Sequence, residues 1–261
     1  MPIEVLFLAF ASGVLIGLVL GLVGGGGSIL AVPLIVYVVG VSSPHIAIGT
    51  AAIAVALNAA VGLIGHWREG AVKWRCASVF ALAGMAGAVI GAELGKSFDG
   101  QRLLGLFGIL MIVVGGAMLR KRTTLPQPDV RLTLDTASQL LPRIIPIGFA
   151  VGVLAGFFGI GGGFLIVPGL ILATRMPLSY AIGTSLVVIT ALGATTAFSY
   201  AISGYVEWSL ALVLVLGGIA GASLGVFLVR RLSRHKRLLE TGFGIGVMIV
   251  GAYVIVRSTF S

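Results

Sequence analysis

The chain has 261 residues, of which 58% are hydrophobic and 10% charged, and its formal net charge is +9. A soluble domain carries roughly 25% charged residues, and the mean hydropathy of +1.16 lies far above the range of such domains. Several apolar stretches are about 20 residues long, as a membrane-crossing helix requires. The sequence therefore excludes an ordinary soluble protein and predicts an all-α, multi-pass membrane protein.

Most Lys and Arg residues lie in short polar stretches between the apolar runs, where cytoplasmic loops of membrane proteins carry them. The lipid bilayer thus accounts for the positive charge, and we expect no nucleic acid as a partner. The single cysteine, Cys76, excludes an intrachain disulfide and a cysteine metal cluster. We expect no signal peptide, because MPIEVLFLAF has no basic residue before its apolar run.

Two similar series of elements follow one another along the chain. Each begins with an apolar run, passes through a glycine-rich stretch into a short apolar run, and ends with three long helices. In the first half these elements are expected at about 3–23, 28–41, 46–66, 76–95 and 102–119. In the second half they are expected at about 144–158, 163–174, 181–203, 208–229 and 238–256. We therefore predict a first transmembrane repeat at 1–119, a cytoplasmic linker at 120–143 and a second transmembrane repeat at 144–261.

Three motifs occur once in each half, at an offset of 134 or 135 residues. They are the glycine-rich stretches LGLVGGGGSILAVP (20–33) and AGFFGIGGGFLIVP (155–168), the Ala-Ile-Gly-Thr sequences at 47–50 and 181–184, and the Gly-x-Val-x-Trp patterns at 70–74 and 204–208. Self-similarity at one long period indicates an internal duplication.

Charge predicts how the two halves face the membrane. The linker and the segment RRLSRHKR at 230–237 are basic and are both expected in the cytoplasm. The glycine-linked pair of runs must then cross an even number of times, as a hairpin of two short spans or one re-entrant loop. Equivalent loops fall on opposite sides, with 66–75 inside and 203–209 outside. This predicts inverted repeats, an arrangement typical of secondary transporters.

The glycine-rich stretches are the first candidate site. Irregular backbone at membrane depth survives only when it is buried in protein or lines a watery cavity. Each stretch is followed by a short helix, whose N-terminus carries unpaired N–H groups and a partial positive charge that favour an anion. We expect an anion-binding site at Gly24, Gly25, Gly26, Gly27, Ser28, Gly159, Gly161, Gly162 and Gly163. The alternative is that these glycines only permit a tight hairpin and close helix crossing.

Polar residues within the long helices extend this candidate substrate-binding site. Thr50 and Thr184 are equivalent in the two repeats, and Ser185 adds a hydroxyl beside Thr184. Asn58 lies deep in its span, where a buried amide is costly unless it is paired. Its equivalent is Leu192, so the polar lining is asymmetric. The competing interpretation is that Ser and Thr hydroxyls bond to their own helix or to a neighbour.

Other glycines are expected to serve packing alone. The segments GMAGAVIGAELG (84–95) and GGIAGASLG (217–225) repeat glycine every three or four residues, and small residues let membrane helices approach closely. Catalysis has little support, because the sequence has no nucleophile elbow, no His-x-x-x-His pair and no carboxylate in the middle of a span. We expect no enzymatic activity, no cofactor and no metal site.

The doubled glycine-rich stretch ending in Pro, with the Ala-Ile-Gly-Thr and Gly-x-Val-x-Trp motifs, resembles the TauE/SafE sulfite exporter family over residues 5–256. The resemblance implies a multi-pass permease of the plasma membrane, which in bacteria is the inner membrane, for small sulfur-containing or organic anions such as sulfite, sulfoacetate or thiosulfate. It also implies export coupled to an ion gradient without an ATP-binding partner. Ile160 departs from the first half, which has Gly25. Family members are described with eight spans, whereas the sequence allows ten if both hairpins cross fully.

The sequence thus predicts a secondary transporter that exports a small anion. Two alternatives remain open, a passive anion channel and a non-transporting membrane partner or assembly factor that docks a soluble enzyme through RRLSRHKR. Also open are the identity of the anion, the coupling ion (proton or sodium) and whether two chains form a homodimer.

Overall fold

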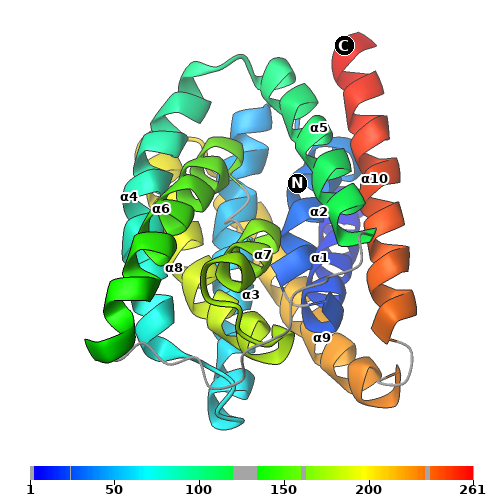
Figure 1. The fold of residues 1–261 in the computed structure, drawn as a ribbon. Coiled ribbons are helices and arrows are strands. Elements are labelled where there is room, and N and C mark those ends of the chain that lie inside the picture. The colour runs from blue at the N-terminus through cyan, green and yellow to red at the C-terminus, as the bar shows by residue number, and fades with distance from the viewer. Residues whose placement is uncertain (1–2, 24, 120–133, 160–162, 233–235, 261) are drawn as a thin grey trace.

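The computed structural model describes residues 3–23, 25–119, 134–159, 163–232 and 236–260. The described chain is all-helical, which confirms the predicted fold class (Figure 1). Within these residues, eight helices are long and apolar enough to cross a membrane, and two apolar helices are shorter.

The helices follow the order predicted for the two halves. The long helices of the first half are α1 (Ile3–Val23), α3 (Pro44–Arg68), α4 (Trp74–Ser97) and α5 (Gly100–Leu119). Those of the second half are α6 (Leu134–Phe158), α8 (Leu178–Ile202), α9 (Trp208–Leu232) and α10 (Lys236–Phe260). The short elements are the 3-10 turn η1 (Gly25–Gly27), α2 (Ser28–Pro33) and the π-helical turn η2 (Leu34–Val38) in the first half, and α7 (Gly163–Thr174) in the second.

Each glycine-linked hairpin has unequal arms. The arm before the glycines, α1 or α6, is long enough to span a bilayer, and only the returning arm is short. The described spans therefore number eight, the smaller of the two counts that the sequence allows. Within the linker predicted at 120–143, residues 134–143 belong to α6, which begins at Leu134 and contains Pro142. The division into two repeats and a linker stays a prediction. Hydropathy alone does not detect a helix that continues from the bilayer into polar residues. Residues 120–133 lie outside the described chain.

Equivalent C-caps end α3 and α8, the two helices that carry the Ala-Ile-Gly-Thr motif. Gly70 and Gly204 follow these helices with φ of +68° and +75°. The Ala71 N–H donates to the His66 carbonyl at 3.0 Å, and the second half repeats this bond at 2.9 Å. Such a Schellman cap needs a left-handed residue after the helix, which glycine supplies without strain. The first glycine of Gly-x-Val-x-Trp therefore stops the helix and turns the chain.

Two seams of glycine residues join the first half to the second. α1 packs parallel to α9, where Gly17 meets Gly218, and α4 packs parallel to α6, where Gly84 meets Gly152. A Cβ atom on Gly17 or Gly152 would collide with the backbone of the facing helix. The glycine-rich segments of α4 and α9 thus bring helix backbones into direct contact, as predicted.

The remaining large contacts also pair one helix from each half. α3 lies antiparallel to α8, with Ala56 against Gly193 and Gly62 against Leu186. α5 lies antiparallel to α10 at the side of the bundle, with Gly108 against Gly251. Because α4 turns back after α3 and α9 turns back after α8, each helix of the first half runs opposite to its counterpart in the second (Figure 1). The halves form one interlocked bundle.

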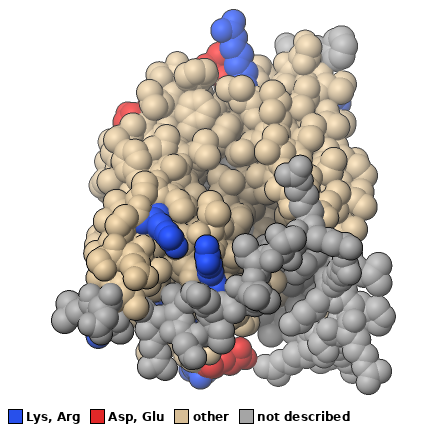
Figure 2. All heavy atoms as spheres, in the orientation of Figure 1, with Lys and Arg blue, Asp and Glu red and all other residues tan. Residues whose placement is uncertain are grey.

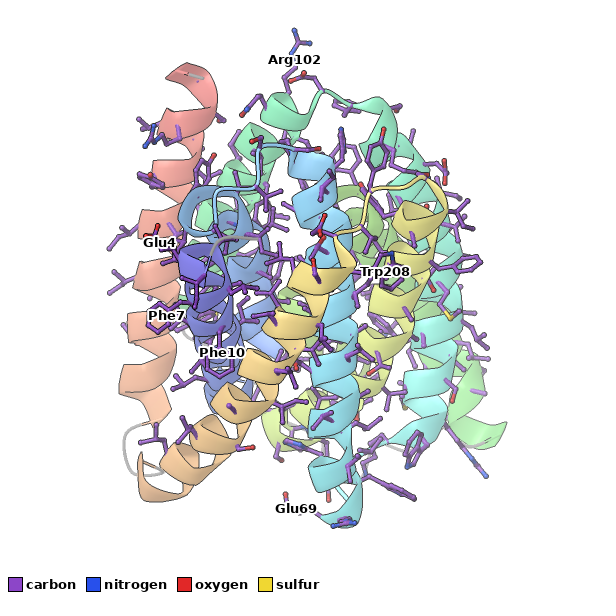
Figure 3. The ribbon with its side chains drawn as sticks, turned by 180° about the vertical axis from the view of Figure 1, so that it is seen from behind. Glu4, Phe7, Phe10, Glu69, Arg102 and Trp208 are labelled. Atoms are coloured by element: carbon purple, nitrogen blue, oxygen red, sulfur yellow. The ribbon has the colours of Figure 1, made fainter. Side chains whose placement is uncertain are left out.

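The bundle has two ends, which we name the 69–73 end and the 203–207 end after the loops that lie there. Figure 3 shows Glu69 and Arg102 at these opposite ends, and Figure 2 shows an uncharged band between charges that lie toward the ends. The charged side chains described at the 69–73 end are Arg68, Glu69, Lys73, Arg75, Arg143 and Arg175. Those at the 203–207 end are Glu4, Glu93, Lys96, Asp99, Arg102, Glu207 and Arg257.

The α4–α6 seam predicts a large effect of a single methyl group. We expect Gly152→Ala to lower the free energy of unfolding by about 1–3 kcal/mol, because the new Cβ meets the Gly84 backbone, which cannot move aside. Thermal unfolding in detergent measures the loss. Gly116→Ala on α5 is the matched control, because no atom lies within 4 Å of its Cβ position. It should keep or raise Tm, since Ala is the better helix former. Equal Tm values for the two variants would contradict the seam's role.

Candidate functional site

The first glycine-rich stretch lies inside the bundle. Gly26, Gly27 and Ser28 are buried, and η1 contacts α1, α7 and α8. A Cβ atom on Gly27 would press against the Ile16 carbonyl and the Leu20 amide nitrogen of α1. The chain therefore folds back onto α1 only because this residue has no side chain. Gly24 lies outside the described residues.

The described residues of the second stretch, Gly159 and Gly163, are buried as well. Gly159 follows α6 with φ of +64°, and its N–H donates to the Gly156 carbonyl at 3.1 Å. A Cβ atom there would collide with Ile48 of α3. Gly163 is buried and begins α7. The other two predicted glycines, 161 and 162, lie outside the described residues, as does residue 160.

The described residues of the first stretch lie beside α7, the short helix of the second half. η1 of the first half contacts α7, and α2 also contacts α7. The described part of the first stretch thus lies against the short helix that follows the second stretch. The first N–H groups of a helix have no acceptor within the helix, so the start of α7 offers donors inside the protein. The assignment of these glycines to anion binding stays a prediction.

The predicted threonines hold loops of the opposite half. The Glu207 N–H donates to Thr50 Oγ1 at 3.1 Å, and the Lys73 N–H donates to Thr184 Oγ1 at 3.0 Å. Both threonine side chains are fully buried. The preceding glycine of each motif, residue 49 or 183, leaves space for a loop carbonyl, which a Cβ atom would hit. The Ala-Ile-Gly-Thr motif of each half therefore holds the Gly-x-Val-x-Trp loop of the other half. We call each of these two equivalent contacts a clasp.

The two clasps lie at opposite ends of the bundle. Thr50 lies at the 203–207 end and Thr184 at the 69–73 end, so one small ligand does not touch both. Ser185, next to Thr184, is buried and donates to the Ile182 carbonyl at 2.7 Å. The structure thus gives all three hydroxyls a partner within the protein. Their role in substrate binding stays a prediction.

Asn58 is buried without a partner. Its side chain is 1% exposed, and neither Nδ2 nor Oδ1 has a hydrogen-bond partner among the described residues. Its amide packs against Gly218, where a Cβ atom would collide with Nδ2. Asn58 lies near the middle of α3, and Gly218 belongs to the α1–α9 seam. An unpaired buried amide costs free energy, so Asn58 is the predicted residue whose surroundings most require a ligand or water.

Other buried side chains share this property. Polar atoms that are buried and lack a hydrogen-bond partner among the described residues belong to Ser12, Tyr37, His45, Asn58, Thr196 and Tyr200. No signal in the sequence singles out Tyr200 as unpaired, because pairing depends on neighbours that are distant along the chain. No group of three His, Cys, Asp or Glu side chains suited to a metal ion occurs in the described part of the chain.

An apolar groove of about 290 Å³ opens on the outer surface between α3 and α8. It is lined by Ile53, Ala56, Leu57, Ala194, Ala197, Phe198, Ala201 and Trp208. Trp208 is labelled in Figure 3 and is exposed. None of the predicted site residues lines this groove, and its lining suits hydrocarbon rather than an anion.

Comparisons with known proteins agree on one class. The family model described as sulfite exporter TauE/SafE matches residues 9–254. The chain is 50% identical to a "Probable membrane transporter protein" of Xylella fastidiosa (strain Temecula1), over 99% of this chain and 98% of that protein. It is 29% identical to the "Probable membrane transporter protein YunE" of Bacillus subtilis, over 95% and 97% of the two chains. No solved structure matches the chain significantly.

The clasps make a testable prediction about Thr50 and Thr184. Replacing either threonine by Val leaves a buried loop N–H without an acceptor, which costs about 1–3 kcal/mol, so both Val variants should unfold at lower temperature in detergent. Thr→Ser at the same positions keeps the oxygen and serves as the control. If the Val variants kept the wild-type Tm but lost anion binding, the hydroxyls would serve the ligand and not the loops.

Proposed function

The chain belongs to the sulfite exporter TauE/SafE family, and on that basis we propose that it is a secondary transporter that exports a small sulfur-containing or organic anion such as sulfite or a sulfonate. Its family, its relatives and its eight candidate spans make it a multi-pass membrane transporter. The nature of the anion and the direction of transport are the proposed part.

The observation that carries the proposal is the buried contact between η1 and α7. It supports a site in which the glycine-rich stretches of both halves offer backbone N–H groups to one solute. A helix N-terminus adds a partial positive charge. In inverted-repeat transporters, half-helix ends of this kind bind the substrate near the membrane midplane.

The chemistry of the interior also favours an anion. The buried polar side chains described are Ser12, Ser28, Thr50, Asn58, Thr174, Thr184, Ser185 and Thr196. All are neutral, and most can donate a hydrogen bond. A negatively charged solute would therefore meet hydroxyl, amide and backbone dipoles and no buried carboxylate from this set.

The charges at the ends support an orientation. At the 69–73 end, five of the six described charged side chains are basic, whereas at the 203–207 end only three of seven are. By the positive-inside rule we assign the 69–73 end to the cytoplasm. Together with the opposite directions of counterpart helices, this supports the predicted inverted repeats.

Flux measurements test the function directly. Purified protein in liposomes loaded with radiolabelled sulfite should release it in a saturable manner, and an imposed proton or sodium gradient should drive accumulation against a sulfite gradient. Gly26→Leu should abolish flux, because its side chain would fill the buried turn. Gly246→Leu is the control, because its Cβ faces open space on α10.

Two results would contradict the proposal in different ways. Flux that never exceeds equilibrium under any gradient would indicate a passive channel. No flux with sulfite, sulfoacetate or thiosulfate, together with copurification of a soluble enzyme, would indicate the assembly-factor alternative.

Asn58 provides a second test. We expect Asn58→Leu, which copies its repeat equivalent Leu192, to keep or raise Tm, because it removes an unpaired buried amide. If Asn58 binds the anion, the same variant should raise KM for sulfite roughly tenfold or more, as expected for losing a hydrogen bond to a charged group. Thr190→Val is the control, because the Thr190 hydroxyl is already paired with the Leu186 carbonyl at 2.8 Å. An Asn58→Leu protein with lower Tm and normal KM would make Asn58 structural.

A further inference from the structure

α8 carries two unpaired hydroxyls close to the 203–207 end. Thr196 and Tyr200 are both 0% exposed, and neither hydroxyl has a hydrogen-bond partner among the described residues. Residues four apart lie on the same face of a helix, one turn from each other. Other hydroxyls of α8 are paired, since Thr190 and Thr195 each donate to a carbonyl of their own helix at 2.8 Å. The missing partners are therefore a local property of this face of α8.

A third unpaired group comes from α3. His45 Nδ1 is buried and has no hydrogen-bond partner in the described structure. The His45 ring lies 5.4 Å from the ring of Tyr205, which in turn lies 6.3 Å from the ring of Tyr200. Gly49, one turn after His45, leaves space for both Tyr200 and the Tyr205 carbonyl. Two helices from different halves thus bring unpaired polar groups to both sides of one loop residue.

An ion pair lies beside this cluster. The Lys96 side chain is only 13% exposed, and its Nζ lies 5.9 Å from the centre of the Tyr200 ring. Lys96 donates to Ser203 Oγ at 2.9 Å and to Glu93 Oε1 at 2.7 Å, which fixes the ammonium group over the ring. Glu93 is exposed and also accepts a bond from Ser199 Oγ at 3.0 Å, so the ion pair ties α4 to α8 beside Tyr200.

The opposite end of the bundle has no equivalent among the described residues. The repeat counterpart of Thr196 is Gly62, which has no side chain, and that of Tyr200 is His66. His66 Nδ1 lies 3.2 Å from the Gly62 carbonyl and is therefore paired. The duplication alone does not explain the unpaired groups, because it would produce them at both ends.

We propose that the Thr196 and Tyr200 hydroxyls form a second anion subsite near the 203–207 end, for the same class of small oxyanion. The inference rests on the proposed function for the class of ligand. The Thr196 and Tyr200 hydroxyls can each donate to an oxyanion oxygen, and His45 lies beyond Tyr205 as a further unpaired group at the same end. The loop held by Thr50 covers the subsite, so an anion reaches it from outside when that clasp opens.

The first experiment removes a single oxygen. Tyr200→Phe keeps the ring and its packing, and we expect it to raise KM for radiolabelled sulfite in proteoliposomes by about fivefold or more while the maximal rate changes less. Tyr253→Phe is the matched control, because Tyr253 is exposed on α10 and its hydroxyl accepts a bond from Arg257 at 3.2 Å. The control should keep the wild-type KM.

The second experiment measures access from the outside. In a Cys76→Ser background, Thr196→Cys and Tyr200→Cys should react in right-side-out vesicles with the impermeant anion 2-sulfonatoethyl methanethiosulfonate. Sodium sulfate, which does not consume this reagent, should slow the reaction. Phe198→Cys is the control on the same helix, because Phe198 is 70% exposed on the apolar surface and its thiol would lie in hydrocarbon. It should not react.

The outcomes separate the subsite from the function. Sulfite flux with a normal KM in Tyr200→Phe, or thiols at 196 and 200 that do not react or react without slowing by sulfate, would overturn the subsite and leave the transporter proposal standing. Sulfate-sensitive labelling at both positions without sulfite flux in the wild type would support the subsite and refute sulfite transport.

Discussion

Close contact between helix backbones is the constraint on which the rest of this bundle depends. Lipid tails are as apolar as leucine, so helices inside a bilayer gain little from hiding apolar side chains and associate through packing. Here glycine residues supply that packing at the α1–α9 and α4–α6 seams, where a methyl group would already collide with backbone. Each seam joins one half to the other. The duplicated halves are therefore not two separate domains, and each supports the other's glycine-rich turn.

The seams also fix the position of the turns. α1 packs along α9 and α6 packs along α4, so in each half the first long helix ends inside the protein. From there it must return over a short helix. A return of this kind exposes backbone groups, which is tolerated at membrane depth only where protein or a watery cavity surrounds them. The burial of Gly27 and Gly159 meets that condition.

The two ends of the bundle are alike in backbone and different in side chains. The clasps on Thr50 and Thr184 use the same bond at both ends, but the loop residue is Glu207 at one end and Lys73 at the other. Within the described part of the chain, the unpaired groups on Tyr200 and His45 also lack equivalents at the opposite end. Duplication therefore accounts for the shared backbone arrangement, whereas differences between side chains distinguish the two ends of the bundle. Unpaired buried groups reduce stability, and their concentration at one end is more consistent with a role for a ligand than with packing.

The sequence by itself determined the class of the protein, the order of its helices and the existence of a repeat, and it left eight or ten spans open. These properties depend on hydropathy and on local spacing, which a single chain displays directly. It also identified the packing role of the glycines in α4 and α9, because helical periodicity puts them on one face. The start of α6 at Leu134 was not visible, since polar residues continue a helix beyond the bilayer without an apolar signal.

Only the tertiary structure decided how individual polar residues are used. From the sequence, Thr50 and Thr184 are predicted in the substrate-binding site. Only the structure shows that each accepts a bond from a loop more than 100 residues away. In the sequence, Asn58 and Tyr200 cannot be told apart from polar residues that are hydrogen-bonded. Their lack of partners depends on which neighbours other helices place around them. A hydrogen bond depends on distances between atoms of separate elements, and no local pattern along one chain contains that information.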